Sequence, residues 1–194
     1  PRHAEHRDLL DDPRRLYHED GRYCDEAVSI IREVRMAAAD AGFYHMCTPQ
    51  ALGGAGLGHL AYYVAWEALF HRCGPQHWLM LYALAHWAFG PSRLLEKVTP
   101  EARARFLPDL MAGRTSMCFG LSEPNAGSDA SMIKTRAERV GDAWRLNGRK
   151  IWTTNAPIAD YCIVFAATDP DQAAKKAGGI SAFVVPTTSP GFKV

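Results

Sequence analysis

The first part of the chain, up to about Gly113, carries the three-to-four spacing of apolar residues that is typical of helices. The segment Asp25–Ala41 shows this spacing most clearly, and Gly42 follows it as a stop signal. The apolar positions of this segment are Val28, Ile31, Val34 and Ala38. We therefore expect a helix with a single apolar stripe.

Two further segments, Leu60–Arg72 and Gln76–Phe89, are apolar nearly all round, which predicts helices packed between other helices. Residues 99–101 (Thr-Pro-Glu) have the order expected where a helix begins. The threonine can act as the N-cap, the proline fits the first turn, and the acid lies near the positive end of the helix dipole. This helix should end near Gly113.

After Gly113 the apolar repeat changes to two, which is typical of strands. The expected strands are Met117–Leu121, Lys134–Val140, Trp144–Asn147, Tyr161–Ala167 and Ile180–Val185. The turn signals between and after them are Gly141-Asp142, Asn147-Gly148, Gly178-Gly179 and Pro190-Gly191. Asn147-Gly148, between AWRL and RKIW, is a strong hairpin signal.

Helices first and strands afterwards predict an α+β fold. We expect an N-terminal α-helical domain over residues 1–113 and an antiparallel β-rich middle domain over residues 114–194. The last strand-like run, residues 192–194, ends without a closing partner, and an antiparallel sheet left there would have an open edge. The sequence therefore suggests a piece of a longer protein.

Composition narrows the class of protein. Hydrophobic residues make up 47% and charged residues 22%, the net charge is +1, and no basic cluster suggests nucleic-acid binding. The five cysteines are an odd number without a CxxC pair, which indicates reduced thiols in a cytoplasmic protein and neither a disulfide framework nor a metal site. Residues 1–12 lack a signal-peptide core, and the apolar run His77–Phe89 is shorter than the ~20 residues that span a bilayer. We expect no membrane span.

Two segments carry candidate chemistry. In CFGLSEPNAGSD, residues 118–129, small residues would let a bulky planar or phosphorylated ligand approach the backbone, and Ser122 and Ser128 add hydroxyls. In IWTTNAPIADY, residues 151–161, the Trp152 indole next to two threonines suits a flat heteroaromatic ring. Taken singly, the first segment is explained equally well by an ordinary surface loop, and a core tryptophan at a strand end is the more common explanation of the second.

Taken together, these segments resemble the middle domain of acyl-CoA dehydrogenases. The intervening KTRAERVGDAWRLNGRKIWTTNA and the later GGISAFVVPTTSPGFKV agree in order and spacing, and TPQALGGAGLG, residues 48–58, resembles a loop between helices of the family's N-terminal domain. Three positions depart from the usual pattern: Leu52 stands for a tyrosine, Asn125 for a frequent glycine, and Ser122 for a frequent threonine. These departures leave the flavin contacts in place but can alter acyl-chain fit.

The resemblance implies a flavin-dependent oxidoreductase that desaturates an acyl-CoA thioester between its α and β carbons, with the β-hydride passing to N5 of FAD. Ser122 would bond the pyrimidine edge of the flavin, Trp152 would pack on the ring, and Thr154 would bond near N5. Ser128 would also touch the CoA part of the substrate, and His86 would lie in the helix that lines the acyl cavity. The implied cofactor-binding residues are Phe119, Gly120, Leu121, Ser122, Gly127, Ser128, Trp152, Thr153 and Thr154.

The resemblance also implies what this chain does not contain. In relatives the catalytic base is a glutamate of the C-terminal helical bundle, which would lie beyond residue 194, so no catalytic residue is assigned here. The implied partners are the acyl-CoA substrate, an electron-transfer flavoprotein and further copies of the chain, as a dimer or tetramer. An acyl-CoA oxidase, a flavin monooxygenase, a carrier-protein-linked acyl dehydrogenase and a non-catalytic scaffold relative remain alternatives.

Three other readings carry less weight. Gly56-x-Gly58-x-x-Ala61 formally resembles a dinucleotide fingerprint, but no strand is expected before it. His3 and His6 could share a helix face, although an exposed N-terminal helix is a simpler interpretation than a metal pair. Glu123 is expected to hold its turn and not to act as a catalytic base.

Overall fold

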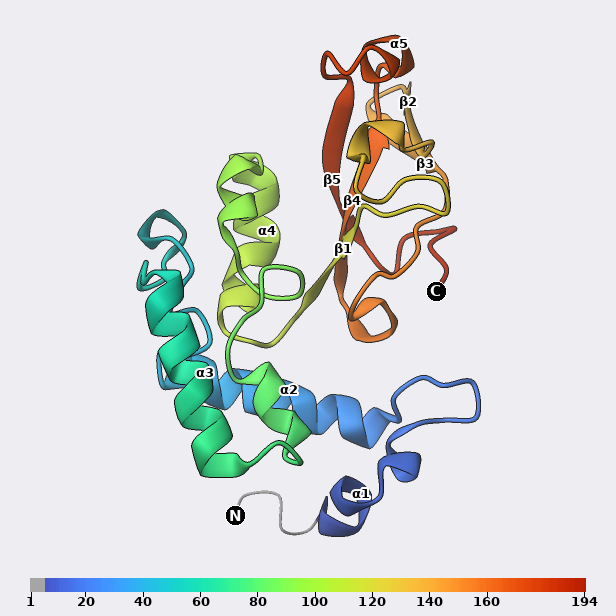
Figure 1. Cartoon of the computed structure of the whole chain (residues 1–194). Helices are drawn as coiled ribbons and strands as arrows, with labels where there is room; N and C mark the ends of the chain where they lie inside the picture. Colours follow the sequence, from blue (N-terminus) through green and yellow to red (C-terminus); the bar gives the residue numbers. More distant parts are fainter. Residues whose placement is uncertain (1–5) are drawn as a thin grey trace. The chain divides into compact units, whose positions relative to one another are not determined.

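The computed structural model describes residues 6–194, which form two compact units that divide between Ser116 and Met117. The sequence predicts the division after Gly113. The first unit is helical and the second contains all the strands of the described chain, so the predicted α+β order is confirmed (Figure 1). His3, considered as half of a metal pair, lies outside the described residues, and His6 instead bonds Glu26 at 2.6 Å between Nδ1 and Oε1.

The first unit contains three helices that the sequence predicts and several shorter turns. Its α-helices are α1 (Arg7–Asp11), α2 (Asp25–Asp40), α3 (His59–Cys73) and α4 (Pro100–Met111). Its 3₁₀ helices are η2 (Pro13–Leu16), η3 (Gln50–Leu52), η4 (Trp78–Tyr82) and η5 (Arg93–Lys97). The start of α4 is as predicted, because the Thr99 side chain accepts a hydrogen bond from the Ala102 N–H.

The buried stripe of α2 differs from the predicted one. The buried residues are Ala27, Ile30, Ile31, Arg35 and Ala39, whereas Val28, Val34 and Ala38 are only half-buried. Arg35 can face the interior because its Nε donates to the Gly113 carbonyl at 3.1 Å, and the alanines allow close packing. The apolar pattern alone could not reveal this long-range partner.

The predicted helix Gln76–Phe89 is wrong. The chain forms the short 3₁₀ helix η4 and then turns. One reason is that the Ala88 N–H donates to Nδ1 of His86 at 3.2 Å, so this backbone donor is not available for a helical bond.

Helix α3 extends one residue beyond the predicted segment at each end, but its surroundings are not the predicted ones. None of its residues is buried, and Leu60 is 80% exposed. Within residues 6–194, therefore, this apolar helix is not packed between others. Every helix of the described chain is too short or too polar to traverse a bilayer.

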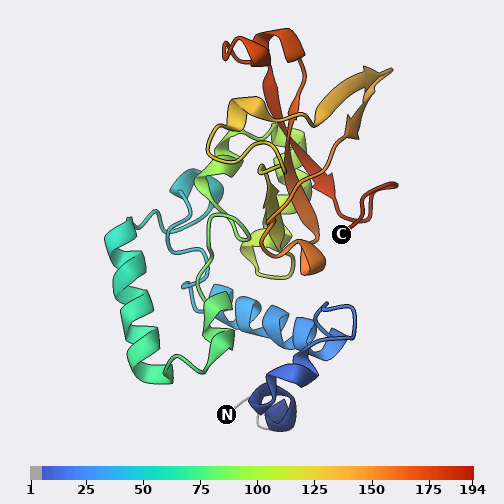
Figure 2. The same ribbon diagram turned by 45° about the vertical axis from the view of Figure 1, so that its right-hand side comes forward.

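The second unit is a five-stranded sheet in which β4 is central (Figure 2). Its strands are β1 (Met117–Gly120), β2 (Arg136–Val140), β3 (Ala143–Asn147), β4 (Tyr161–Ala167) and β5 (Ile180–Pro186). The short helices η6 (Ala130–Met132), η7 (Ala156–Ile158) and α5 (Pro170–Ala174) lie in its connections. All five predicted strand segments are confirmed.

The strand pairing is mixed. In agreement with the predicted antiparallel sheet, β2 pairs antiparallel with β3, and β4 pairs antiparallel with β5. However, β1 runs parallel to β4, with Cys118 opposite Cys162, and β2 meets β4 in a parallel bridge. Both cysteines are buried, and all five cysteines of the chain are free thiols.

Two local predictions near this sheet are wrong. Gly141-Asp142 forms the turn between β2 and β3, but Asn147-Gly148 does not begin a second hairpin, because residues 148–151 form no strand. A Cβ at Gly148 would lie 2.2 Å from Oγ1 of Thr135, so the chain passes close to Thr135 where only glycine fits. Residues 192–194 also form no strand, and Phe192 packs on the cluster around Cys118 and Cys162.

The close approach of Gly113 to α2 gives the first testable prediction. Gly113 has φ +71°, and an added Cβ would lie 2.6 Å from the Arg35 carbonyl carbon. Gly113→Ala should lower the free energy of unfolding by about 3 kcal/mol or more, since backbone strain and a clash add. Gly42→Ala is the matched control, because Gly42 has φ +80° with no atom near the added Cβ, and should cost only about 1–2 kcal/mol. Urea unfolding followed by far-UV circular dichroism would measure both, and equal losses would contradict the predicted clash.

Candidate functional site

The two segments with candidate chemistry lie side by side because β1 and β4 are parallel. After β3 the chain must return to the first residues of β1 before β4 begins. On this return the Ile151 N–H donates to the Ser122 carbonyl at 2.9 Å. Further on, Nδ2 of Asn155 donates to the Met117 carbonyl at 3.2 Å. Residues 151–155 therefore run back along residues 117–122.

The loop after β1 begins with a tight turn and then opens to solvent. Glu123 and Ala126 exchange two backbone hydrogen bonds, of 2.8 and 3.1 Å, and the Asn125 side chain donates to the Met132 carbonyl. Gly127 and Ser128 are exposed, and no atom lies within 4 Å of a Cβ placed on Gly127. A ligand can therefore approach the backbone at this point.

The buried Glu123 side chain stabilises this turn. Its carboxylate is almost fully buried and accepts hydrogen bonds from the Lys134 N–H (2.6 Å), the Thr135 N–H (3.0 Å) and the Thr135 hydroxyl. Nζ of Lys150 pairs with the same carboxylate at 2.8 Å. Burial alone would raise the pKa of Glu123, but the bonds from Lys150, Thr135 and the two backbone N–H groups lower it to about 2. Glu123 is thus ionised and structural, as the sequence predicts.

Trp152 is held in an unusual conformation on the returning segment. Its φ is +56°, a region that costs a non-glycine residue roughly 1–3 kcal/mol, and its side chain is 88% exposed. The exposure rules out a core tryptophan. Its position also differs from the prediction, because it lies in a loop and not at a strand end. A strained backbone that presents a bare indole indicates a surface for another molecule.

The remaining predicted cofactor residues of this unit lie around these two segments. Phe119 is half-buried with its ring centre 4.9 Å from that of Phe165, and Gly120 is buried. Leu121, Ser122 and Thr153 are half-buried, whereas Thr154 is exposed. The structure therefore brings residues 119–122 together with residues 151–155. Of the predicted set, Gly127 and Ser128 lie farther along the loop.

His86 belongs to the helical unit, but it lies in the turns after η4 and not in the helix that the resemblance implies. Its ring stacks on Phe89 with centres 5.2 Å apart and lies 5.2 Å from the ring of Trp87. Burial lowers the pKa of His86, so the ring is neutral near pH 7. Because Nδ1 accepts the Ala88 N–H, the proton of the neutral ring is assigned to Nε2.

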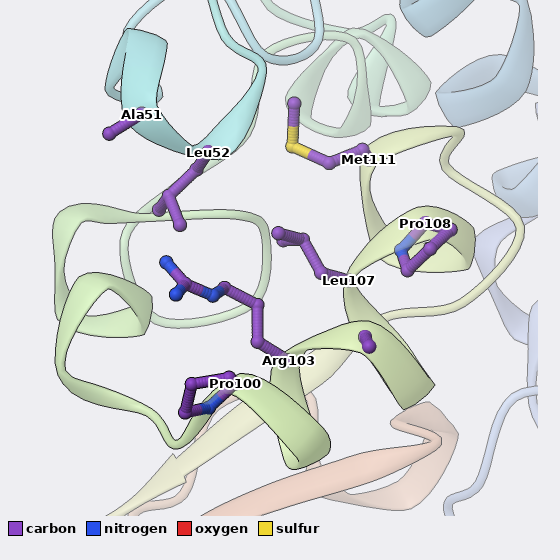
Figure 3. Close-up of a pocket in the computed structure, with 8 residues that line it drawn as sticks. Ala51, Leu52, Pro100, Arg103, Leu107, Pro108 and Met111 are labelled. Carbon is purple, nitrogen blue, oxygen red and sulfur yellow. The ribbon is translucent and has the colours of Figure 1, made fainter.

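The helical unit also contains an apolar groove between η3 and α4, of about 420 Å³ (Figure 3). Leu52 lines it, at the position where the family usually has tyrosine, together with Leu107 and Met111 of α4. Figure 3 shows the Arg103 side chain reaching across this groove toward Leu52. The segment before Gly56 is η3 and not a strand, so the dinucleotide fingerprint lacks its required context.

Sequence reasoning missed three residues that build the site: Lys150, Thr135 and Asn155. Lys150 pairs with Glu123 and Thr135 bonds the same carboxylate, while Asn155 adopts φ +71° and bonds back to β1. One signal was available. A glutamate in a loop of small residues needs donors if it is buried, and a lysine two residues before Trp152 is a suitable counterion.

Comparison with known proteins agrees with this arrangement. Residues 3–114 match the family model described as acyl-CoA dehydrogenase, N-terminal domain, and residues 118–194 match the middle domain. Human mitochondrial short-chain specific acyl-CoA dehydrogenase is 40% identical over 151 residues, which cover 78% of this chain and 35% of the relative. Subunit CarC of the caffeyl-CoA reductase–Etf complex of Acetobacterium woodii is 35% identical over 170 residues, covering 88% and 43%.

Solved structures of acyl-CoA dehydrogenases are also similar to this chain. A glutaryl-CoA dehydrogenase from Mycobacterium smegmatis in complex with FADH2 is 28% identical, with a TM-score of 0.64, and the match covers 95% of this chain and 50% of that one. The chain thus spans about two fifths of the length of the curated relatives and half of this structure.

The buried carboxylate predicts how stability depends on pH. The folded pKa of Glu123 is about 2, below its usual 4.5, so its contribution is complete above pH 4.5 and is lost as pH falls toward 2. This loss should reach about 3 kcal/mol for the wild-type chain and be absent in Glu123→Gln, as measured by urea unfolding from pH 7 to pH 2.5.

Asp129 provides the matched control. Hydrogen bonds from Lys176 and Ser131 also lower its pKa to about 2, but its side chain is 48% exposed. Because solvent screens an exposed pair, Asp129→Asn should remove much less of the acid dependence than Glu123→Gln does. An equal effect of the two substitutions would show that burial does not set the strength of the Glu123 network.

Proposed function

The chain belongs to the acyl-CoA dehydrogenase family, and from that premise we propose that it forms the flavin-ring wall of an FAD-dependent acyl-CoA dehydrogenase. The observation that carries the proposal is the exposed Trp152 indole, held in a strained loop directly beside residues 119–122. We define the ring wall as Phe119–Ser122 together with Trp152–Thr154.

The chemistry of the ring wall fits an isoalloxazine. A flat tricyclic ring needs one apolar face to stack on and polar groups at its edge. Trp152 offers the face, while the hydroxyls of Ser122 and Thr154 offer hydrogen bonds for the edge. When bound, FAD supplies the acceptor for the β-hydride of the acyl thioester at its N5 atom.

The proposed roles are those that the resemblance to the family implies, and the positions of the residues are compatible with them. Ser122 binds the pyrimidine edge, Trp152 packs on the ring, and Thr154 orients the ring by a hydrogen bond near N5. Ser128, in the open part of the loop, contacts the cofactor and the CoA part of the substrate. His86 lines the acyl cavity from the helical unit and, being neutral, does so without burying a charge.

Proton removal requires a base, and no residue of this chain is assigned that role. The α-proton of a thioester is weakly acidic, so the base needs a raised pKa in a dry site. Glu123 is unsuitable, because its pKa is lowered to about 2 and several donors occupy its carboxylate. We therefore propose a glutamate outside this sequence as the base, as in the family pattern.

We propose that the electrons leave to an electron-transfer flavoprotein, since a relative belongs to an Etf complex. We also propose a homo-oligomer, as a dimer or tetramer. The free thiols of all five cysteines support a reducing compartment, for which we propose the cytoplasm, although several relatives are mitochondrial.

The test uses the full-length protein that contains this chain. It should be purified with bound flavin, and the flavin absorbance should bleach when acyl-CoA is added without oxygen. Turnover with electron-transfer flavoprotein but not with oxygen identifies a dehydrogenase, whereas turnover with oxygen identifies an oxidase. A protein that takes up no flavin when FAD is supplied would overturn the proposal.

Trp152→Ala in the full-length protein should weaken FAD binding by about tenfold, which corresponds to losing one stacked aromatic contact, and should shift the flavin spectrum. Trp144→Ala is the matched control, because Trp144 is 45% exposed in the same unit and packs on Phe183, and neither residue belongs to the ring wall. Titration of the apoprotein with FAD measures both affinities. Wild-type affinity and an unchanged spectrum in Trp152→Ala would refute the stacking role.

A further inference from the structure

The ion pair between Lys150 and Glu123 is buried, which is unusual for charged side chains. Lys150 is 13% exposed and Glu123 is 3% exposed, with 2.8 Å between Nζ and Oε1. Lys176 and Asp129 form a pair of similar length, 2.7 Å, in the same unit, but they are 64% and 48% exposed. Removing two charges from water costs about as much as their attraction returns, so a buried pair is better explained by the geometry that it fixes.

The contacts of Lys150 lie along the backbone of the ring wall. A Cβ on Gly120 would lie 3.4 Å from Cγ of Lys150, so the lysine stem packs over this glycine. Nζ donates to the Leu121 carbonyl at 3.2 Å before it reaches Glu123. The next residue, Ile151, bonds Ser122 through its backbone N–H. A single side chain thus follows the whole turn from Gly120 to Glu123.

Lys150 is also two residues before Trp152 on the same segment. Between them in the sequence, Ile151 bonds the Ser122 carbonyl, so Lys150 and Trp152 flank the point where the two segments are joined. We propose that Lys150 is a positioning residue for FAD, which fixes the spacing between the two halves of the ring wall by pairing with Glu123. This inference rests on the proposed function, since it names what the ring wall is spaced to receive.

The fold of the unit does not depend on this pair. β4 pairs with β5 along its full length and with β1 over four residues, and none of these hydrogen bonds involves Lys150. Glu123 keeps three other donors if Lys150 is replaced: two backbone N–H groups and the Thr135 hydroxyl. We therefore expect substitutions of Lys150 to displace the ring wall while the sheet persists.

The experiment compares variants of the full-length flavoprotein: Lys150→Met, Lys150→Arg, Glu123→Gln, the double variant Lys150→Met/Glu123→Gln, and Lys176→Met as the matched control. For each, the apoprotein is titrated with FAD, the visible absorption and circular dichroism of bound flavin are recorded, and the melting temperature of the apoprotein is measured. Lys150→Met should raise the Kd for FAD by about tenfold or more and alter the flavin spectrum, and Lys150→Arg should restore part of the affinity. Lys176→Met should match the wild type in its affinity for FAD and in its flavin spectrum.

The double variant separates positioning from simple stability. It removes the buried carboxylate that Lys150→Met leaves without a counterion, so its melting temperature should lie above that of Lys150→Met, whereas its affinity for FAD should not recover. Wild-type affinity and spectrum in Lys150→Met, or recovery of affinity together with melting temperature in the double variant, would overturn the inference. If Lys150→Met does not fold, the FAD affinities of the double variant and of Glu123→Gln, which also lack the ion pair, decide in its place. Both should be weaker than that of the wild type, and wild-type affinity in both would overturn the inference. A wild-type protein that takes up no FAD would instead overturn the proposed function.

Discussion

The parallel pairing of β1 with β4 is the constraint on which the candidate site depends. Two parallel neighbours cannot be joined by a tight turn, so the chain must travel back past β1 before β4 can start. That return carries residues 151–155 along residues 117–122, and two backbone carbonyls of this stretch accept hydrogen bonds from the returning segment. The two segments with candidate chemistry therefore meet because of topology, although they are about thirty residues apart in sequence.

Strand pairing alone does not fix the loop after β1, because the ladder ends at Gly120. Beyond this residue the loop is held by buried polar side chains. Glu123 is buried with a full set of donors, and Lys150 connects it to the returning segment. A buried carboxylate with fewer donors would shift its pKa upward or expose itself, so the loop has one well-defined position. Side-chain hydrogen bonds thus fix the part of the loop that the strand ladder does not reach.

The sequence predicts the regular elements well and the irregular ones poorly. Local signals were sufficient for these elements: the apolar composition for α3, the Thr-Pro-Glu start for α4, and the repeat of two with turn residues for the five strands. The second hairpin at Asn147-Gly148 failed because the local preference for a tight turn was overruled by contacts with Thr135 and Ser122, which are distant in the sequence. The stripe on α2 shifted for a similar reason, since Arg35 is buried only because Gly113 supplies its acceptor.

The candidate site also divides into features that the local sequence reveals and features that distant contacts impose. The motifs of residues 118–129 and 151–161 were recognisable from their residue types, and the exposed Trp152 settles the choice between a core and a surface role. Its positive φ, the left-handed Asn155 and the Lys150 contact were not recognisable, because each is imposed by tertiary contacts and not by local propensity. No pattern of apolar and polar residues encodes such conformations.

The location of these contacts has a consequence for specificity. The hydrogen bonds described above for the ring wall join residues of Met117–Val194, whereas His86 and the groove lined by Leu52 lie in the helical unit. A ring wall that is held by contacts within its own unit loses less conformational entropy when a ligand binds than a mobile one would. On the proposed function, substitutions in the helical unit, such as leucine for the family's tyrosine at position 52, can then change acyl-chain fit without displacing the flavin ring. Cofactor placement and substrate selection would thus rest on separate parts of the chain, each free to vary without the other.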